Sequence, residues 1–355
     1  TVEARVGGRP ADVARTTPES VDMQALLRDM VDAGDRACAM EVSSHALVQR
    51  RAAGVDVDVA VFTNLTRDHL DYHGDMESYY AAKRRLFLRP DGEGANPGAA
   101  VNLDDAHGRR LAAETDAIGF GLDARDAAVL VRDLVPSGTG TGLVIQTPRG
   151  RVEVESRLRG RFNASNVAGV VAAGEVLGLV QEDVVRGIEG VRGVPGRFEA
   201  VDEGGPVQVI VDYAHTPDSL ENVLRTARTL VGGGRVLVVF GCGGDRDRGK
   251  RAQMGAAARA LADVAIVTSD NPRGEDPDAI IAEIVAGADR GPAELLVEAD
   301  RRGAIAMAVD GARPGDLVLI AGKGHEQGQE VAGVVTPFDD RDVAREILGV
   351  GPACG

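Results

Sequence analysis

Lysine is rare in this chain, and its few positions lie in segments whose residue types could do chemistry. Among 40 lysines and arginines in 355 residues, only Lys83, Lys250 and Lys323 are lysines. Their contexts read YYAAKRRLF, GGDRDRGKR and AGKGHEQ. An arginine stays protonated in a protein, whereas a lysine amine can be neutralised, carboxylated or used as a compact partner for phosphate. Codon bias could leave one such lysine by chance, but three in motif-like places favour chemical roles.

A loop rich in histidine and aspartate leads into the helix that carries Lys83. Its polar members are Asp68, His69, Asp71, His73 and Asp75. Carboxylates near a strand end suit a divalent ion; an all-oxygen preference indicates Mg²⁺, and one imidazole is tolerated. Glu41, in the segment MEVSSH, is a further candidate ligand. The alternative is a solvated loop in which an aspartate caps the next helix, with Lys83 on the surface.

The segment GGDRDRGKR resembles a phosphate-binding loop in spacing only. Gly244 to Lys250 fits the pattern GxxxxGK, but Arg251 replaces the serine or threonine whose hydroxyl would hold Mg²⁺. Arginines inside the loop would also crowd the phosphates of a nucleotide. We therefore reject it as the nucleotide loop and expect Arg246 to serve an anionic substrate.

Three further segments combine polar residues with turn formers. In DYAHTPDSL, Asp212 ends an expected strand and His215 could stack on a base, although a simple helix cap explains the segment equally well. In SDNPRGEDP, Arg273 could form a bidentate pair with a substrate carboxylate, unless the segment is only a turn. In AGKGHEQ, Glu326 could bind a substrate ammonium while the glycines let the backbone approach closely.

Alternating strand and helix patterns must position these segments and predict an α/β fold with parallel sheets. In the first half we expect strands at 37–42, 57–62, 99–102 and 117–120, helices at 21–33, 76–88, 164–177 and after 181, and an antiparallel hairpin insertion at 127–156. In the second half we expect strands at 207–212, 235–241, 264–270 and 317–322, with helices starting near 216, 249, 277 and 300. Ligands of open α/β sheets bind beyond the carboxyl ends of strands, where the second half carries its polar segments.

Length and composition limit the organisation and the partners. A chain of 355 residues favours two domains. The glycine- and proline-containing stretch 191–197 is the expected linker between a central domain, 1–190, and a Rossmann-like domain, 198–355. The net charge of −15 argues against a nucleic-acid or anionic-membrane binder.

Cysteine usage and hydropathy indicate the cytoplasm. Cys38, Cys242 and Cys354 show neither metal-ligand spacing nor a disulfide framework, which fits a reducing compartment. The sequence contains no signal peptide and no apolar run that could span a bilayer.

Taken together and in order, these segments resemble the Mur ligase family, within it the enzymes that add the third residue of the peptidoglycan stem. The resemblance runs from Arg15-Thr16-Thr17 to the C-terminus. It implies an ATP-dependent ligase that needs Mg²⁺ and acts on UDP-N-acetylmuramoyl-L-alanyl-D-glutamate. The substrate carboxylate would attack the γ-phosphate of ATP, and an amine would displace phosphate from the acyl phosphate. We expect a cytoplasmic monomer.

The resemblance also implies roles for individual residues. Lys83 would be carboxylated by CO₂ to a carbamate that helps to hold magnesium, with Glu41 and His69 as metal ligands; the implied catalytic residues are Lys83, His69 and Asn64. Positions for the UDP-linked substrate are Thr16, Thr17, Ser43, Gln49 and Arg51. Nucleotide contacts would come from Asn166, Arg197, Asp212 and His215. The amino-acid site would comprise Arg246, Asp270, Asn271, Pro272, Arg273, Gly322 and Glu326.

The motif Asp270-Asn271-Pro272-Arg273 resembles the version in family members that add meso-diaminopimelate. Diaminopimelate has a second carboxylate onto which Arg273 can fork, and a lysine-adding homologue should lack this arginine. L-lysine addition is therefore the less favoured reading. Another branch of the superfamily, a folylpolyglutamate synthetase or a cyanophycin-type ligase, is a weaker alternative.

Three features depart from the family pattern. The N-terminal uridine-binding domain and the GxxGKT/S loop of the central domain are not in the sequence, and Arg15 replaces the usual asparagine. We expect an incomplete central domain, either in a fragment of an active ligase or in a degenerate, non-catalytic paralogue that keeps the amino-acid site. Without that loop's backbone cradle, this chain alone should use ATP poorly.

Overall fold

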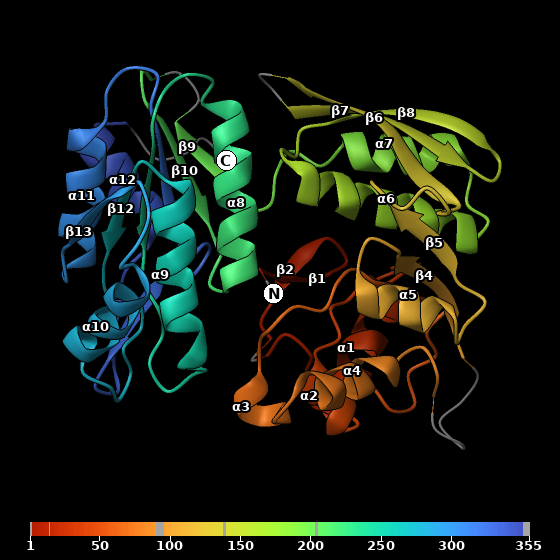
Figure 1. Cartoon of the computed structure of the whole chain (residues 1–355). Helices are drawn as coiled ribbons and strands as arrows, with labels where there is room; N and C mark the ends of the chain where they lie inside the picture. The colour runs from red at the N-terminus through yellow and green to blue at the C-terminus, as the bar shows by residue number, and fades with distance from the viewer. Residues whose placement is uncertain (1, 14, 90–95, 138–139, 203–204, 351–355) are drawn as a thin grey trace. The chain divides into compact units, whose positions relative to one another are not determined.

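The computed structural model describes residues 2–13, 15–89, 96–137, 140–202 and 205–350 (Figure 1). They form a mixed α/β protein with parallel-dominated sheets, which confirms the predicted fold class. The chain divides into two compact units. The first unit comprises Thr1–Leu65 and Tyr72–Arg192, and the second comprises Thr66–Asp71 and Gly193–Gly355.

The first unit is built on a six-stranded sheet in the order β3-β4-β5-β6-β7-β8. Its strands are β3 (Val59–Phe62), β4 (Gly98–Asn102), β5 (Ile118–Gly121), β6 (Val129–Ser137), β7 (Gly140–Thr147) and β8 (Gly150–Ser156). The first four pair in parallel and the last three antiparallel. The antiparallel strands expected at 127–156 form as β6, β7 and β8. Because β6 pairs with β5, these three strands extend the main sheet.

Helix α6 (Arg161–Val176) packs on this sheet through small residues. A Cβ added to Gly169 would lie 3.1 Å from the ring of Phe120, so this glycine lets helix and sheet approach closely. The other elements of this part of the chain are β1 (Ala4–Val6), β2 (Arg9–Ala11), α1 (Ser20–Asp32), α2 (Ser44–Val48), α3 (Leu70–His73), α4 (Met76–Arg84), α5 (Ala106–Ala112) and α7 (Gln181–Glu189).

The strand expected at 37–42 does not form. Its sequence alternates in the manner of a strand, but Cys38 and its neighbours are largely exposed, and no described strand pairs with this segment. A strand needs a neighbour to satisfy its backbone hydrogen bonds. Alternation alone therefore gave the wrong prediction here.

The second unit contains a sheet in the order β13-β12-β11-β14-β10-β9. Its strands are β9 (Glu199–Asp202), β10 (Gln208–Asp212), β11 (Val236–Phe240), β12 (Val264–Val267), β13 (Glu294–Val297) and β14 (Leu317–Ala321), and its helices are α8 (Pro217–Leu230), α9 (Gly249–Leu261), α10 (Pro277–Gly287), α11 (Arg301–Gly311) and α12 (Asp340–Leu348). All strands except β9 are parallel, and branched aliphatic side chains from both sheet and helices form the core.

A two-stranded hairpin, β15 (Gly328–Val331) and β16 (Val334–Pro337), was not expected from the sequence. It follows the loop after β14 and contacts the loop after β12, since Gln329 Nε2 donates to the carbonyl oxygen of Asp270 at 2.8 Å. Its sequence predicted no strand because its four-residue strands carry exposed valines, such as Val334 and Val335, instead of a buried alternating face.

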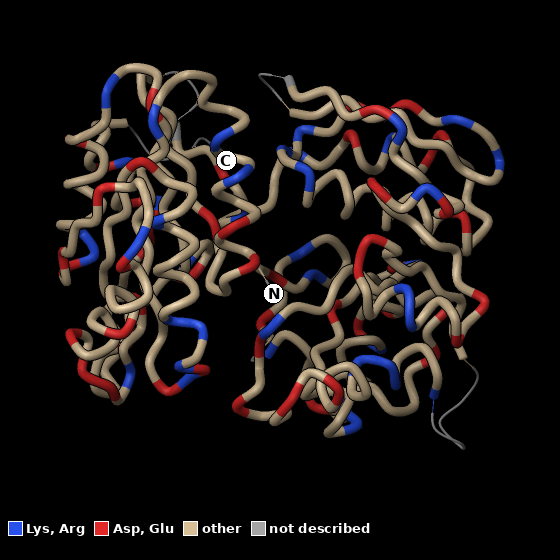
Figure 2. Tube along the Cα trace, viewed as in Figure 1, with Lys and Arg blue, Asp and Glu red and all other residues tan. Residues whose placement is uncertain are grey.

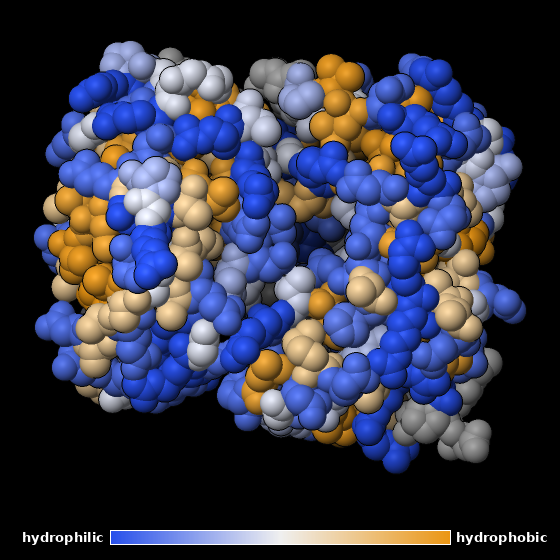
Figure 3. Space-filling model, in the orientation of Figure 1, coloured by the Kyte–Doolittle hydropathy of each residue, from blue (hydrophilic) through white to orange (hydrophobic). Residues whose placement is uncertain are grey.

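Charges of both signs are spread over both units (Figure 2). The face seen in Figure 3 is largely hydrophilic, with hydrophobic residues gathered in small patches. No helix in the described part of the chain is long and apolar enough to cross a membrane.

Candidate functional site

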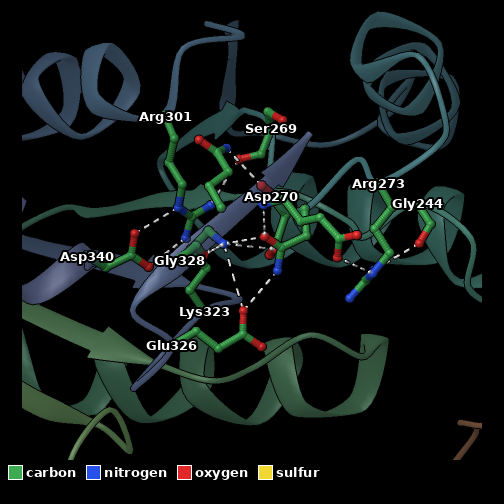
Figure 4. Close-up of polar contacts among 12 residues, drawn as sticks. Gly244, Ser269, Asp270, Arg273, Arg301, Lys323, Glu326, Gly328 and Asp340 are labelled. Carbon is green, nitrogen blue, oxygen red and sulfur yellow. Dashed lines mark hydrogen bonds and ion pairs between the residues drawn. The ribbon is translucent and has the colours of Figure 1, made fainter. Parts of the chain in front are cut away.

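Two loops of the second unit meet in a buried polar network at the carboxyl-terminal edge of its sheet (Figure 4). Asn271, in the loop after β12, connects them. Its Nδ2 donates to Glu326 Oε2 at 2.9 Å, and its Oδ1 accepts from Lys323 Nζ at 2.7 Å. The carboxylate of Asp270 is buried beside them, 3.8 Å from Lys323 Nζ. Three residues expected in the amino-acid site therefore lie together where parallel sheets bind ligands.

Arg273 is held in an unusual backbone conformation by the β15–β16 hairpin. Its φ of 53° lies in the left-handed region, which is uncommon for residues other than glycine. Its N–H donates to the carbonyl oxygen of Glu330 at 3.1 Å, and its own carbonyl oxygen accepts from the N–H of Ala332 at 2.7 Å. The guanidinium donates from Nη1 to the carbonyl oxygen of Gly244 at 2.8 Å, and Nε lies 3.5 Å from the Glu330 carboxylate. The remaining N–H groups suit a substrate carboxylate.

The loop after β11 brings Arg246 to the same place. A Cβ added to Gly243 would lie 2.8 Å from Arg273 Nη1 and 3.9 Å from Arg246 Cγ, so both arginines pass this glycine. A Cβ at Gly244 would overlap the carbonyl oxygen of Pro272, 1.9 Å away. The two glycines therefore allow the loops after β11 and β12 to touch, and Arg246 is exposed beside Arg273.

The segment GGDRDRGKR, which we rejected as a nucleotide-binding loop, has a structural role at its last residue, Arg251. The side chain of Arg251 is 1% exposed and pairs with Glu275 at 2.7 Å and with Glu283 at 2.9 Å. Its hydrogen bonds lower the pKa of Glu275 to about 2. Arg251 therefore holds the start of α9 to the loop after β12 and the helix α10, and it supplies no magnesium ligand.

Sequence reasoning assigned no role to Lys323 and missed Arg301 and Asp340. Arg301 and Asp340 form a fully buried bidentate pair, with Nε–Oδ1 at 2.8 Å and Nη2–Oδ2 at 2.7 Å (Figure 4). Both residues are the first residue of a helix. At such a position the sequence gives no sign that a charged side chain is buried and not exposed to solvent. Gly322 fits its predicted place, since an added Cβ would lie 2.5 Å from the Asp270 carboxylate.

Asp212 holds the first residues after the linker in place. The carboxylate is buried and accepts from the N–H of Phe198 and from the N–H of Ala214, both at 2.7 Å. Burial raises the pKa of Asp212, and these backbone hydrogen bonds oppose part of the rise. Its role in the structure is to tie the linker to the turn after β10.

An aromatic cluster surrounds that turn. The guanidinium of Arg197 lies 4.5 Å from the ring centre of Tyr213, a cation–π contact that the sequence did not predict. His215 lies 4.6 Å from the same ring, and its Nε2 is 3.6 Å from the carboxylate of Asp68. Burial would raise the pKa of Asp68, but the contact with His215 and neighbouring positive charges lower it overall. Three of the four expected nucleotide-binding residues thus lie close together, whereas Asn166 lies on α6 in the first unit.

In the first unit, four of the five residues expected to bind the UDP-linked substrate form one hydrogen-bonded network. Thr17 Oγ1 donates to the carbonyl oxygen of Glu41 and accepts from the N–H of Ser43, both at 3.0 Å. Arg51 is buried, donates from Nη1 to the carbonyl oxygen of Thr17 at 3.2 Å and contacts the side-chain oxygen of Gln49. The fifth residue, Thr16, is exposed next to this network.

Lys83 and the neighbouring polar residues are the expected metal site. Lys83 is half-buried near the end of α4, with Nζ 5.9 Å from the ring centre of Tyr79. Asp75 caps α4 by accepting a hydrogen bond from the N–H of Ser78 at 2.7 Å, and His73 contacts Ser44. In the structure, both side chains therefore make local contacts within the first unit. No cluster of three or more histidine, cysteine or acidic side chains suited to a metal occurs among the described residues.

A magnesium ion usually keeps several waters and binds through one or two carboxylates together with substrate phosphates. An exposed carboxylate at Glu41 and a carboxylated Lys83, both in the first unit, would supply oxygen ligands of the kind that magnesium prefers. His69 belongs to the second unit, and Asn64 is exposed two residues after β3.

Fold and side chains together define a two-unit α/β protein with a buried polar network at the carboxyl ends of the strands of its second unit. The family model for the Mur ligase middle domain matches residues 1–174, and that for the Mur ligase glutamate ligase domain matches residues 196–324. The chain belongs to the Mur ligase family.

Its relatives include UDP-N-acetylmuramoyl-L-alanyl-D-glutamate–2,6-diaminopimelate ligases. The one from Geobacter metallireducens is 48% identical, covering 96% of this chain and 70% of the relative. The one from Synechococcus elongatus is 50% identical, covering 94% and 67%. A solved structure of a ligase with this description superposes with a TM-score of 0.62 at 38% identity over 96% of this chain and 71% of that structure. A folylpolyglutamate synthase from Mycobacterium tuberculosis, 19% identical with a TM-score of 0.65 over 94% of this chain and 76% of that one, shares the fold.

Proposed function

We propose that this chain carries the substrate and amino-acid sites of a ligase that adds meso-2,6-diaminopimelate to UDP-N-acetylmuramoyl-L-alanyl-D-glutamate. The diaminopimelate-adding class, predicted from Asp270 to Arg273, agrees with relatives of that description at 46 to 50% identity. The observation that carries the proposal is that Arg246 and Arg273 lie beside the same glycine, Gly243, while Asn271, in the loop of Arg273, holds Glu326. We call this proposed binding site the amino-acid pocket.

One carboxylate and one ammonium group of diaminopimelate find a counterpart in that pocket. Arg273 is fixed by two backbone hydrogen bonds and offers a planar fork to the second carboxylate of diaminopimelate. Glu326, ordered by Asn271, offers a carboxylate to an ammonium group. Holding the amine in a fixed position favours its attack on an activated carboxyl carbon, since orientation removes much of the entropic barrier.

The activated carboxyl group would be an acyl phosphate formed with ATP, as the family resemblance implies. Arg197, Tyr213 and His215 form an aromatic and cationic surface suited to a purine base and its phosphates. Mg²⁺ would offset phosphate charge when bound near Lys83 and Glu41. The network of Thr17, Ser43 and Arg51 would hold the UDP-linked substrate.

Calorimetric titration of the purified protein with meso-diaminopimelate tests the proposal, with L-lysine as the control ligand. Arg273→Ala should weaken diaminopimelate binding about 10- to 100-fold, the value of a charge-assisted bidentate pair. Arg248→Ala is the matched control, because Arg248 lies on the same loop as Arg246 but pairs outward with Glu283.

If the wild-type protein shows no heat of binding, the titration is repeated with the full-length protein in the presence of the UDP-linked substrate and a non-hydrolysable ATP analogue. Equal affinity for L-lysine and diaminopimelate, or full affinity in Arg273→Ala, would contradict the assignment.

A further inference from the structure

Lys323 is a lysine without any solvent exposure in the middle of the amino-acid pocket. Its Nζ donates to Asn271 Oδ1 at 2.7 Å and to the carbonyl oxygen of Gly328 at 2.8 Å. Burial lowers the pKa of this ammonium, and the carboxylates of Asp270 and Glu326 oppose part of that effect. Lysine is almost never fully buried unless it is paired, so this position costs free energy that other interactions must offset.

The first consequence of this position concerns the Asn271 amide. An asparagine can present either its oxygen or its nitrogen in a given direction, and its partners decide which. Lys323 Nζ and the N–H of Glu330 are both donors and lie 2.7 Å and 3.0 Å from Oδ1. They turn Nδ2 toward Glu326, to which it donates. Lys323 therefore orients the Glu326 carboxylate through Asn271.

The second consequence is electrostatic. Lys323 Nζ lies 3.8 Å from a carboxylate oxygen of Asp270 and 3.8 Å from one of Glu326 (Figure 4). Arg301 lies nearby, but its charge is already paired with Asp340. One ammonium between these two carboxylates leaves this group of three side chains with a single net negative charge, which one substrate ammonium would neutralise. Without Lys323, the carboxylates of Asp270 and Glu326 would lose the ammonium that lies between them.

The backbone on either side of Lys323 is tightly packed. Gly322 and Gly324, on either side, have φ values of 120° and 54°. A Cβ would lie 2.5 Å from the Asp270 carboxylate at the first and 2.6 Å from the carbonyl oxygen of Gly196 at the second. The loop is thus packed tightly against its surroundings, and the compact ammonium of Lys323 reaches two acceptors there.

We propose that Lys323 is the positioning residue of the amino-acid pocket: it orients Glu326 through Asn271 and sets the charge of the pocket so that it accepts one ammonium group of the incoming amino acid. Lys323 itself touches neither reacting atom. The inference rests on the proposed function, since it assumes that this pocket binds diaminopimelate.

The test compares Lys323→Met and Lys323→Gln with the wild-type full-length protein in a diaminopimelate-dependent phosphate-release assay. Both variants lose the charge, but glutamine can still donate one hydrogen bond to Asn271. We expect the KM for diaminopimelate to rise about 10- to 100-fold in both, the range for losing one or two charge-assisted hydrogen bonds, while the KM for ATP changes less than about 3-fold.

The matched control is Arg235→Met. Arg235 is a part-buried cation that pairs with a buried carboxylate, at 2.6 Å from Asp316. Both residues precede their strands, at the opposite edge of the sheet. This variant should lose stability and keep the wild-type KM for diaminopimelate. An unchanged KM for diaminopimelate in folded Lys323→Gln, or an equal rise of both KM values, would overturn the inference. Absence of diaminopimelate-dependent turnover in the wild type would instead contradict the proposed function.

A measurement on the unaltered side chain covers the case in which neither variant folds. With only three lysines in this sequence, ¹⁵N-lysine labelling gives few side-chain signals from it, and Lys83→Arg and Lys250→Arg identify that of Lys323 by elimination. Saturation with diaminopimelate, with the UDP-linked substrate and a non-hydrolysable ATP analogue present, should shift the Lys323 ammonium signal. A signal that does not move while the ligand binds would refute the positioning role.

Discussion

The buried pair between Arg301 and Asp340 offers a prediction of large magnitude. Both side chains have 0% exposure and meet through two hydrogen bonds, at 2.8 Å and 2.7 Å. Arg301 also donates to the carbonyl oxygen of Ala321, at the end of β14, and to that of Ser269. Burial would lower the pKa of Arg301, but the Asp340 carboxylate raises it well above its ordinary value, so the guanidinium stays charged.

Asp340→Asn should leave that guanidinium buried without a counter-charge. Removing one partner of a buried pair costs about 3–5 kcal/mol. Arg301→Met should cost at least as much, because it also leaves the carbonyl oxygens of Ala321 and Ser269 without this donor, and an unsatisfied buried acceptor adds about 1–3 kcal/mol. For a unit of this size, each kcal/mol shifts the Tm by about 2–4 °C. Asp340→Asn should therefore lower the Tm of the second unit by roughly 6–20 °C.

Thermal unfolding followed by calorimetry measures the effect, and the neighbouring residue supplies the control. Arg302 pairs with Glu346 on the same two helices, but both side chains are more than half exposed. Exposed pairs contribute about 0–1 kcal/mol, so Arg302→Met should leave the Tm nearly unchanged. A Tm for Asp340→Asn within 2 °C of that of Arg302→Met would refute the reasoning from burial.

Three further predictions concern other parts of the chain. Gly196→Ala should destabilise the second unit by more than about 2 kcal/mol in denaturant unfolding, because the φ of Gly196 is 66° and an added Cβ would lie 2.1 Å from a backbone nitrogen. Gly193→Ala is the control and should be nearly neutral, because an added Cβ there meets no atom within 4 Å. Glu275→Gln should reduce the stability of the protein at pH 7 but not at pH 2. The hydrogen bond from Arg251 lowers the pKa of Glu275 in the folded state to about 2. The ionised Glu275 therefore contributes stability above the unfolded pKa of about 4.3, and this contribution is lost as the pH falls toward 2. Lys83→Arg should lower kcat of the full-length protein about 100-fold or more, since a guanidinium cannot be carboxylated; a kcat near the wild-type value would remove the carbamate role.

Strong local patterns made most of the second unit predictable. Runs such as VLVVF and LVLIA, each followed by glycine or polar residues, strongly predict buried parallel strands. The polar segments after them had to share one edge of the sheet, so the proximity of Asp270 and Glu326 could be inferred before any distance was known. That inference used only the direction of the strands.

Features that depend on tertiary contacts were not predictable in this way. The left-handed backbone of Arg273 requires the β15–β16 hairpin, whose exposed valines give no strand signal. The pairing of Arg301 with Asp340 joins residues 39 positions apart whose local sequences resemble helix starts on a surface. The unformed strand at 37–42 illustrates the reverse error, because its alternation was not matched by a pairing partner.

If the proposed function holds, we expect the site to prefer diaminopimelate over L-lysine mainly through added binding energy for diaminopimelate, not through a penalty against L-lysine. In the absence of a substrate carboxylate, the Arg273 guanidinium has a counter-charge of its own in Glu330, 3.5 Å from Nε. An amino acid without the second carboxylate therefore leaves no charge unpaired and incurs little penalty there. Diaminopimelate adds a bidentate pair, worth about 1.5–3 kcal/mol for hydrogen bonds to charged groups, and competes with Glu330 for part of it. Selectivity of this origin amounts to roughly 10- to 100-fold, and it depends on the hairpin that holds Glu330 and Arg273 together.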